Sequence, residues 1–214
     1  PYGRSSAIDT PAPSLDRVYS GATEMILVSG SSGMGKTSVI CEVTKPIVKQ
    51  KDFFLTGKFE QLKRNIPYEA IIQAFRSLVQ QLLTENTENI EVWQEKILSV
   101  VGNNGKVITN LIPELELIIG SQPEVIQLPT KETQNRFNTV FEKFVKVFTR
   151  PEHPLVIFLD DLQWADSASL KLIELLLSNS NSQYLLIIGA YRDNEVNPTH
   201  PLIQTIEKLQ QNTR

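Results

Sequence analysis

The stretch Gly30-Ser31-Ser32-Gly33-Met34-Gly35-Lys36-Thr37 decides how this chain folds. It holds three of the ten glycines in a chain of 214 residues, so glycine is concentrated here and scarce elsewhere. Four consecutive apolar residues, Met25-Ile26-Leu27-Val28, lie just before it and predict a strand over 24–29 that is covered on both faces. Residues 36–49 predict a helix with a kink or break at Pro46. We therefore expect a buried strand, a tight loop and a helix in succession.

The loop matches the phosphate-binding pattern of a glycine, four residues and then Gly-Lys-Ser/Thr. Glycines let backbone N–H groups approach phosphate oxygens, and the helix that follows offers further N–H groups and a partial positive charge. We expect Lys36 to reach the β and γ phosphates, Thr37 to bind Mg²⁺ and Ser38 to reach the α phosphate. The predicted nucleotide-binding residues of this loop are Gly30, Ser31, Ser32, Gly33, Met34, Gly35, Lys36, Thr37 and Ser38. The alternative interpretation is a flexible glycine-rich turn.

The rest of the chain alternates predicted strands with predicted helices. The strands are 53–56, closed by Gly57, then 155–159 and 184–190; the helices are 68–83, 90–101, 131–149, 167–177 and 202–212. Residues 1–22 are expected to be irregular, 103–105 to form a turn and 123–129 a loop, while 106–120 fit no single element. This order predicts one α/β domain over 1–214, a three-layer α/β/α sandwich of the P-loop NTPase class with a mainly parallel sheet and helical insertions between the second and third strands.

Two carboxylates follow the predicted strand 155–159. An acidic pair at the carboxyl end of a buried strand is what a phosphate-binding loop needs to hold Mg²⁺. We expect Asp160 to hold the metal and Asp161 to polarise the attacking water, slowly because aspartate reaches less far than glutamate. The alternative is a helix N-cap. About 120 residues separate Lys36 from Asp160, which leaves room for a strand inserted between the two motif strands.

The last predicted strand, 184–190, is followed by Tyr191, Arg192 and Asp193. Ligands of open α/β sheets bind beyond the carboxyl ends of the strands, so we expect Arg192 to face the same crevice as Asp160. An arginine there neutralises a γ phosphate, and we count it with Lys36 and Asp161 as catalytic. The alternative is a surface ion pair between Arg192 and Asp193 or Glu195.

Composition excludes several classes of protein. One cysteine, Cys41, rules out an internal disulfide framework and a multi-cysteine zinc site, and two histidines leave little for a histidine-based metal centre. A net charge of −3 argues against nucleic-acid or membrane partners. No run of 18 apolar residues and no signal peptide are visible, so we expect a cytoplasmic location. Because the chain opens on Pro1, we expect it to be a piece of a longer protein.

With these motifs, the chain resembles the STAND branch of AAA+-related P-loop ATPases, the signal-transduction ATPases with numerous domains. The resemblance rests on Tyr2-Gly3-Arg4, the glycine loop, the run 160–166 and Gly189-Ala190-Tyr191-Arg192, and it covers nearly all of the chain. It implies ATP or ADP with Mg²⁺ as ligands, a base-contacting segment 1–22 that includes Tyr2, Gly3 and Arg4, and a γ-phosphate sensor at Arg192. It also implies that Trp164 packs its loop, that Asp166 caps the next helix and that His200-Pro201 is structural.

The segment from Gly57-Lys58-Phe59 to Pro67-Tyr68 looks like a subgroup found in large bacterial, cyanobacterial-type sensor proteins. There the ATPase lies between a Ser/Thr kinase domain and GAF and histidine kinase domains, which are the implied partners, with self-association on activation. Members of this branch continue into a helical lid and winged-helix region, for which this chain has no candidate. We therefore expect an incomplete pocket with modest affinity and slow turnover.

The function predicted from these features is an ATP-operated switch in a larger signalling protein. A small-molecule phosphotransferase that uses the same loop is the alternative. A DNA loader of the origin-recognition type is disfavoured by the net charge of −3. A degenerate, scaffold-only domain is disfavoured by the intact Lys36, Thr37 and Asp160.

Overall fold

The computed structural model describes residues 11–30, 40, 45 and 53–212. The chain forms two compact units, residues 1–71 with 149–214 and residues 72–148. Most of the predicted helix 36–49, the loop residues 31–38 and the segment Tyr2-Gly3-Arg4 lie outside the described residues. Ile40 and Lys45 are described and are helical.

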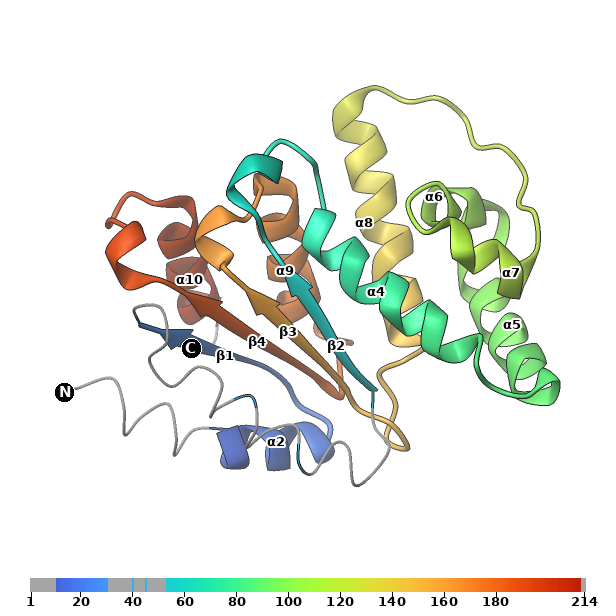
Figure 1. The fold of residues 1–214 in the computed structure, drawn as a ribbon, viewed down its shortest axis with the longest axis horizontal. Helices are drawn as coiled ribbons and strands as arrows, with labels where there is room; N and C mark the ends of the chain where they lie inside the picture. The colour runs from blue at the N-terminus through green and yellow to red at the C-terminus, as the bar shows by residue number, and fades with distance from the viewer. Residues whose placement is uncertain (1–10, 31–39, 41–44, 46–52, 213–214) are drawn as a thin grey trace. The chain divides into compact units, whose positions relative to one another are not determined.

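Four parallel strands form the sheet of the first unit (Figure 1). They are β1 (Thr23–Ser29), β2 (Phe53–Lys58), β3 (Leu155–Asp160) and β4 (Leu185–Tyr191). Their order in the sheet is β1-β4-β3-β2, and all neighbours run parallel. β4 therefore separates the strand that leads into the glycine loop from the strand that ends in the acidic pair. This confirms the prediction of a strand inserted between the two motif strands.

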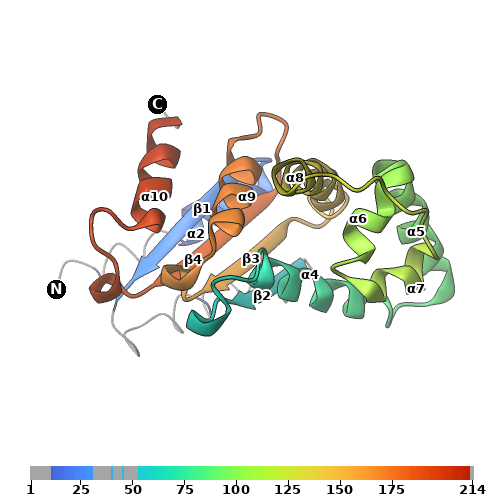
Figure 2. The same ribbon diagram turned by 90° about the horizontal axis from the view of Figure 1, so that it is seen from above.

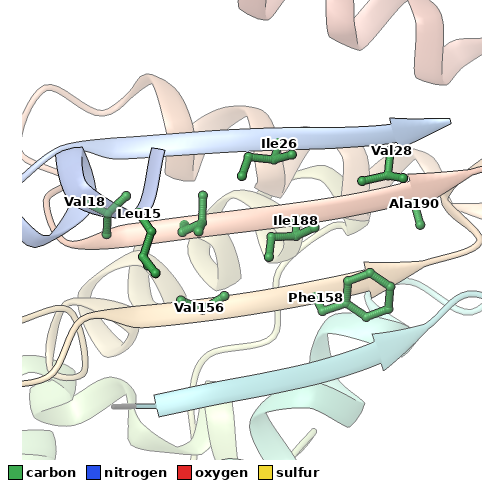
Figure 3. Close-up of a cluster of buried hydrophobic side chains, with 9 residues drawn as sticks. Leu15, Val18, Ile26, Val28, Val156, Phe158, Ile188 and Ala190 are labelled. Carbon is green, nitrogen blue, oxygen red and sulfur yellow. The ribbon is translucent and has the colours of Figure 1, made fainter. Parts of the chain in front are cut away.

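Helix α2 (Pro11–Tyr19) covers one face of this sheet (Figure 3). Its Leu15 and Val18 pack against alternate residues of three strands: Ile26, Val28, Val156, Phe158, Leu186, Ile188 and Ala190. The prediction that residues 1–22 are irregular is wrong from residue 11 onward. Pro11 and Pro13 obscured the helix in the sequence, but both lie in its first turn, where no backbone N–H has a partner within the helix. Burial of Leu15 and Val18 stabilises the helix.

The opposite face of the sheet is covered by α9 (Ser167–Ser178), against which α10 (Pro201–Asn212) packs (Figures 1 and 2). Met25 and Leu27 of β1 point to this face, and they surround Gly189 of β4 together with Leu162. The two covered faces complete three layers, so the predicted α/β/α fold with a parallel sheet is confirmed. No helix in the described ranges has the length and apolar character needed to cross a membrane.

Gly57 lies inside β2, which continues to Lys58, so the prediction that this glycine closes the strand is wrong. A Cβ atom at Gly57 would lie 2.1 Å from the carbonyl oxygen of Ala70, in the first turn of α4 (Glu69–Leu82). The glycine is thus required by the close approach of a helix backbone to the strand, and it does not mark a turn.

The chain between β2 and β3 is largely helical, as predicted for the insertion. Its elements are α4, α5 (Thr87–Val101), α6 (Gly105–Thr109), α7 (Glu116–Ile119) and α8 (Thr130–Lys146). The second unit is built around aromatic side chains that contact one another, namely Phe75, Trp93, Phe137, Phe141, Phe144 and Phe148. Three of these six residues, Phe137, Phe141 and Phe144, belong to α8, so the predicted apolar stripe of this helix contributes to the core of the unit.

Two details of this insertion differ from the sequence-based expectation. Helix α5 begins three residues before the predicted start, because the side chain of Asn86 accepts a hydrogen bond from the backbone N–H of Asn89 at 2.9 Å and caps it. The turn predicted at 103–105 is a 3₁₀ segment, Gly102–Asn104, that leads directly into α6. The unassigned stretch 106–120 consists of short helices, including the 3₁₀ segment Pro113–Leu115.

Candidate functional site

The ends of the four strands bring predicted site residues to one edge of the sheet. The backbone N–H of Gly30, just after β1, donates to the carbonyl of Tyr191 at 3.3 Å, and Arg192 follows directly. On the other side of β4, Asp160 ends β3 in register with Lys58 at the end of β2. We call this the carboxyl edge, defined by Gly30, Lys58, Asp160 and Arg192. It is where parallel α/β sheets bind their ligands.

Asp160 is partly exposed at this edge. Its Oδ1 accepts a hydrogen bond from the backbone N–H of Asp161 at 2.8 Å, and no described basic side chain forms an ion pair with it. A partly exposed carboxylate without an ion-pair partner fits Mg²⁺, which takes one or two carboxylates and completes its shell with water and phosphate oxygens. The described residues contain no group of three or more His, Cys, Asp or Glu suited to a metal held by protein alone. Thr37, the other predicted metal ligand, lies outside them.

Asp161 has a different environment, since it is buried and lies between two cations. Its backbone adopts φ 54°, in the left-handed region, which turns the chain sharply away from β3. The Nζ of Lys58 lies 3.7 Å from its Oδ2, and the Nε of Arg192 lies 3.8 Å from its Oδ1. Neither Asp160 nor Asp161 caps a helix through its side chain. The alternative interpretation of the pair as an N-cap therefore has no support in the contacts.

Arg192 is shared between two carboxylates. Its Nη1 donates to Oε1 of Glu195 at 3.0 Å, so the surface pair that was the alternative interpretation does exist. The same guanidinium also faces Asp161. The hydrogen bond with Glu195, and then the charge of Asp161, raise the pKa of Arg192 above its ordinary value. Its Nε is buried and makes no hydrogen bond to the described residues. Asp193 forms no ion pair with Arg192.

Gln163 is hydrogen-bonded to both Asp161 and Arg192, and sequence reasoning did not single it out. Its side chain is fully buried on the 3₁₀ turn Leu162–Trp164. Its Nε2 donates to Oδ1 of Asp161 at 3.1 Å, and its Oε1 accepts the backbone N–H of Arg192 at 3.2 Å. Sequence reasoning gave no role to Lys58, and it named Glu195 only as an alternative ion-pair partner of Arg192. Lys58 could have been found from the sequence, because it is a lysine at the end of a predicted strand in a P-loop fold. No spacing rule points to Gln163.

Three further predicted roles are borne out by contacts. Asp166 caps α9, since its Oδ2 accepts the backbone N–H of Ser169 at 2.9 Å. Trp164 has a packing role, although its partner lies in another segment, since the guanidinium carbon of Arg64, after β2, lies 5.2 Å from the centre of its ring. His200 is structural, because its Nδ1 accepts the backbone N–H of Leu202 at 3.1 Å in the first turn of α10.

Asp166 also anchors the segment that follows β2. Its Oδ2 accepts the backbone N–H of Tyr68 at 3.2 Å, and Tyr68 has φ 64°. Burial, with the charge of Asp166, raises the pKa of the Tyr68 hydroxyl to about 12. Together with the contact of Arg64 with Trp164, this hydrogen bond joins the segment 57–68, on which the resemblance to sensor proteins rests, to the run 160–166, on which the resemblance to signal-transduction ATPases rests.

Residues 1–188 match the family described as AAA ATPase domain. A 179-residue region covering 84% of the chain is 41% identical to the hybrid signal transduction histidine kinase G of Dictyostelium discoideum, of which it covers 5%. A 166-residue region covering 70% of the chain is 24% identical to histidine protein kinase 1 of Candida albicans, of which it covers 7%. The chain thus spans a small fraction of the length of both relatives.

Proposed function

Because the chain belongs to the AAA ATPase domain family, we propose that it binds ATP or ADP with Mg²⁺, hydrolyses ATP slowly, and acts as a nucleotide-operated switch within a larger signalling protein. The observation that carries this proposal is the carboxyl edge. The backbone N–H of Gly30, the first residue of the phosphate-binding pattern, donates to the carbonyl of Tyr191, which precedes Arg192. The strand that ends at Tyr191, β4, lies beside β3, which ends in Asp160. An anion-binding loop, a metal-binding carboxylate and a cation are the parts that phosphoryl transfer needs.

Each part has a proposed role. The loop 30–38 surrounds the phosphates, with Lys36 on the β and γ phosphates, and Tyr2, Gly3 and Arg4 hold the base. Thr37 and Asp160 hold the metal, and the partial exposure of Asp160 supports this role. Bound Mg²⁺ would neutralise phosphate charge. Arg192 contacts the γ phosphate, which supports its transfer by offsetting negative charge.

Slow hydrolysis follows from the surroundings of Asp161. In hydrolysis, water attacks the γ phosphorus, the bond from that phosphorus to the bridging oxygen of ADP breaks so that ADP leaves, and the proton that the water loses is released to solvent. Asp161 polarises this water in our proposal. Its Oδ1 already accepts a hydrogen bond from Gln163, and Lys58 and Arg192 lie close to its two oxygens. These contacts compete with the attacking water for the two oxygens of Asp161, so turnover is slow without a change in them.

The names of the relatives support the switch function. Both are histidine kinases, and one is described as a hybrid signal transduction kinase. We propose that this domain belongs to the STAND branch. In this proposal it works in a cytoplasmic polypeptide with Ser/Thr kinase, GAF and histidine kinase domains, and it self-associates on activation. The γ phosphate is the signal, since its presence decides whether Arg192 stays with Glu195.

Titration with fluorescent ATP and ADP, with Mg²⁺ and with EDTA, tests the proposal. We expect Lys36→Ala to weaken ATP binding by about 10- to 100-fold, as loss of a charge-assisted contact does. Lys171→Ala is the matched control, because this lysine is exposed on α9 and pairs with Glu174. No binding at millimolar Mg·ATP, or unchanged binding by Lys36→Ala, would overturn the proposal. Phosphate release that requires an added nucleoside or sugar would indicate a phosphotransferase.

A further inference from the structure

We propose that Gln163 is a positioning residue that couples Asp161 to Arg192, so that the side chain acting on the water and the side chain sensing the γ phosphate move together. This inference rests on the proposed function and deepens it. It predicts that Gln163 governs the preference for ATP over ADP and the rate of hydrolysis. Affinity for the part of the nucleotide that ATP and ADP have in common is determined by other residues.

The chemistry of the amide suits this role. A glutamine side chain has one donor end and one acceptor end, and Gln163 uses each on a different partner. The donor, Nε2, holds Oδ1 of Asp161 at 3.1 Å, and the acceptor, Oε1, holds the backbone N–H of Arg192 at 3.2 Å. Because the side chain is fully buried, water does not replace either bond. A carboxylate would lose the donor, and an apolar side chain would lose both ends.

The two partners belong to different parts of the sheet. Asp161 and Gln163 share the sharp turn after β3, whereas Arg192 begins the segment after β4. Arg192 is held to Glu195 through one nitrogen, and its buried Nε lacks a hydrogen bond to the described residues. When Arg192 turns toward a γ phosphate, any shift of its backbone N–H acts on the amide that orients Asp161.

Anchoring of the turn does not depend on this amide. Leu162 is fully buried over Gly189, where an added Cβ would lie 2.3 Å from its Cδ1. This apolar contact holds the turn after β3 against β4 by packing alone. The hydrogen bonds of the Gln163 amide therefore orient Asp161, whereas the burial of Leu162 holds the turn in place.

The test compares Gln163→Met with Gln163→Glu in steady-state hydrolysis and in the ratio of ADP to ATP dissociation constants, from pH 6 to pH 8.5. At pH 8.5 we expect both variants to lower kcat and this ratio by about tenfold relative to wild type, from the loss of a hydrogen bond to a charged group. As pH falls, Gln163→Glu should recover, because a protonated carboxyl group beside Asp161 donates again while its carbonyl accepts from Arg192. Gln163→Met should not recover.

A second comparison uses the Arg192→Ala background. There Gln163→Met should leave the ADP-to-ATP ratio unchanged, since the group that it positions is absent. A purely structural role would lower the melting temperature of both Gln163 variants and leave the ratio at its wild-type value at every pH. That outcome, or equal pH profiles for the two variants, would overturn the inference alone. A wild-type protein that binds no nucleotide would overturn the proposed function as well.

Discussion

The Nε of Arg192 lies 3.8 Å from Oδ1 of Asp161, and this ion pair links the turn after β4 to the turn after β3. Asp161 also has Lys58 on its other oxygen, at 3.7 Å. Arg192 in turn donates to Glu195. Asp161 and Arg192, to which we assign hydrolysis and sensing, therefore each form ion pairs with other protein charges, and a nucleotide must compete with these pairs.

Replacing Arg192 should affect ATP more than ADP. We expect Arg192→Ala to weaken ATP binding by about tenfold and ADP binding by less than about twofold, because only ATP carries the phosphate that the guanidinium contacts. Glu195→Gln should tighten ATP binding, since it removes the charge that competes for Arg192. Isothermal titration of both nucleotides measures these changes, with Lys171→Ala as the control. Equal losses for ATP and ADP would contradict the assignment of Arg192 as a sensor.

The two aspartates should separate metal binding from hydrolysis. Asp160→Asn removes the accessible carboxylate, so the Mg²⁺ concentration needed for half-maximal ATP binding should rise by about tenfold or more. Asp161→Asn should keep the Mg²⁺ dependence and lower kcat, while ATP affinity rises because Lys58 and Arg192 lose their shared carboxylate. Magnesium titrations and a phosphate-release assay distinguish the two. The assignment of roles would be wrong if Asp161→Asn changed the Mg²⁺ dependence and Asp160→Asn did not.

Gly57 should tolerate no side chain. We expect Gly57→Ala to lower the free energy of unfolding by about 1–3 kcal/mol, because its Cβ would lie 2.1 Å from the backbone oxygen of Ala70, which is part of a helix. Gly105→Ala is the matched control, since its Cβ meets the side chain of Gln122, which can move away, and alanine favours the helix. Calorimetry measures both. An unchanged melting temperature for Gly57→Ala would show that β2 and α4 lie farther apart.

Tyr68 should make stability sensitive to alkaline pH. Burial raises the pKa of Tyr68 from its ordinary value near 10 to about 12, so the unfolded state loses this proton first as pH rises. The stabilisation is complete below pH 10 and is lost between about pH 10 and 12, at about 1 kcal/mol per pH unit. Tyr68→Phe should lack this part of the pH dependence. Urea unfolding of both proteins between pH 9 and 11.5 tests it, and parallel curves would contradict the shift.

Local patterns predicted most strands and helices well. The apolar run Leu155–Leu159 and the stripe of α8 each carry their periodicity within a few residues, so both were found from the sequence. Helix α2 was missed because two prolines suggested a loop, and only burial of Leu15 and Val18 against three strands stabilises it as a helix. Gly57 was misinterpreted for a similar reason, since the helix backbone that requires it begins more than ten residues later.

The sequence by itself determined which chemical groups stand at the ends of the strands. The glycine loop, the pair Asp160-Asp161 and Arg192 each directly follow an apolar run, and a local pattern is enough to place them there. The tertiary structure decided which of them meet. The order β1-β4-β3-β2 places the end of β4 beside that of β3, so Arg192 and Lys58 flank Asp161, and Gln163 links two turns distant in sequence. Strand order is set by packing across the whole sheet, and no short stretch of sequence encodes it.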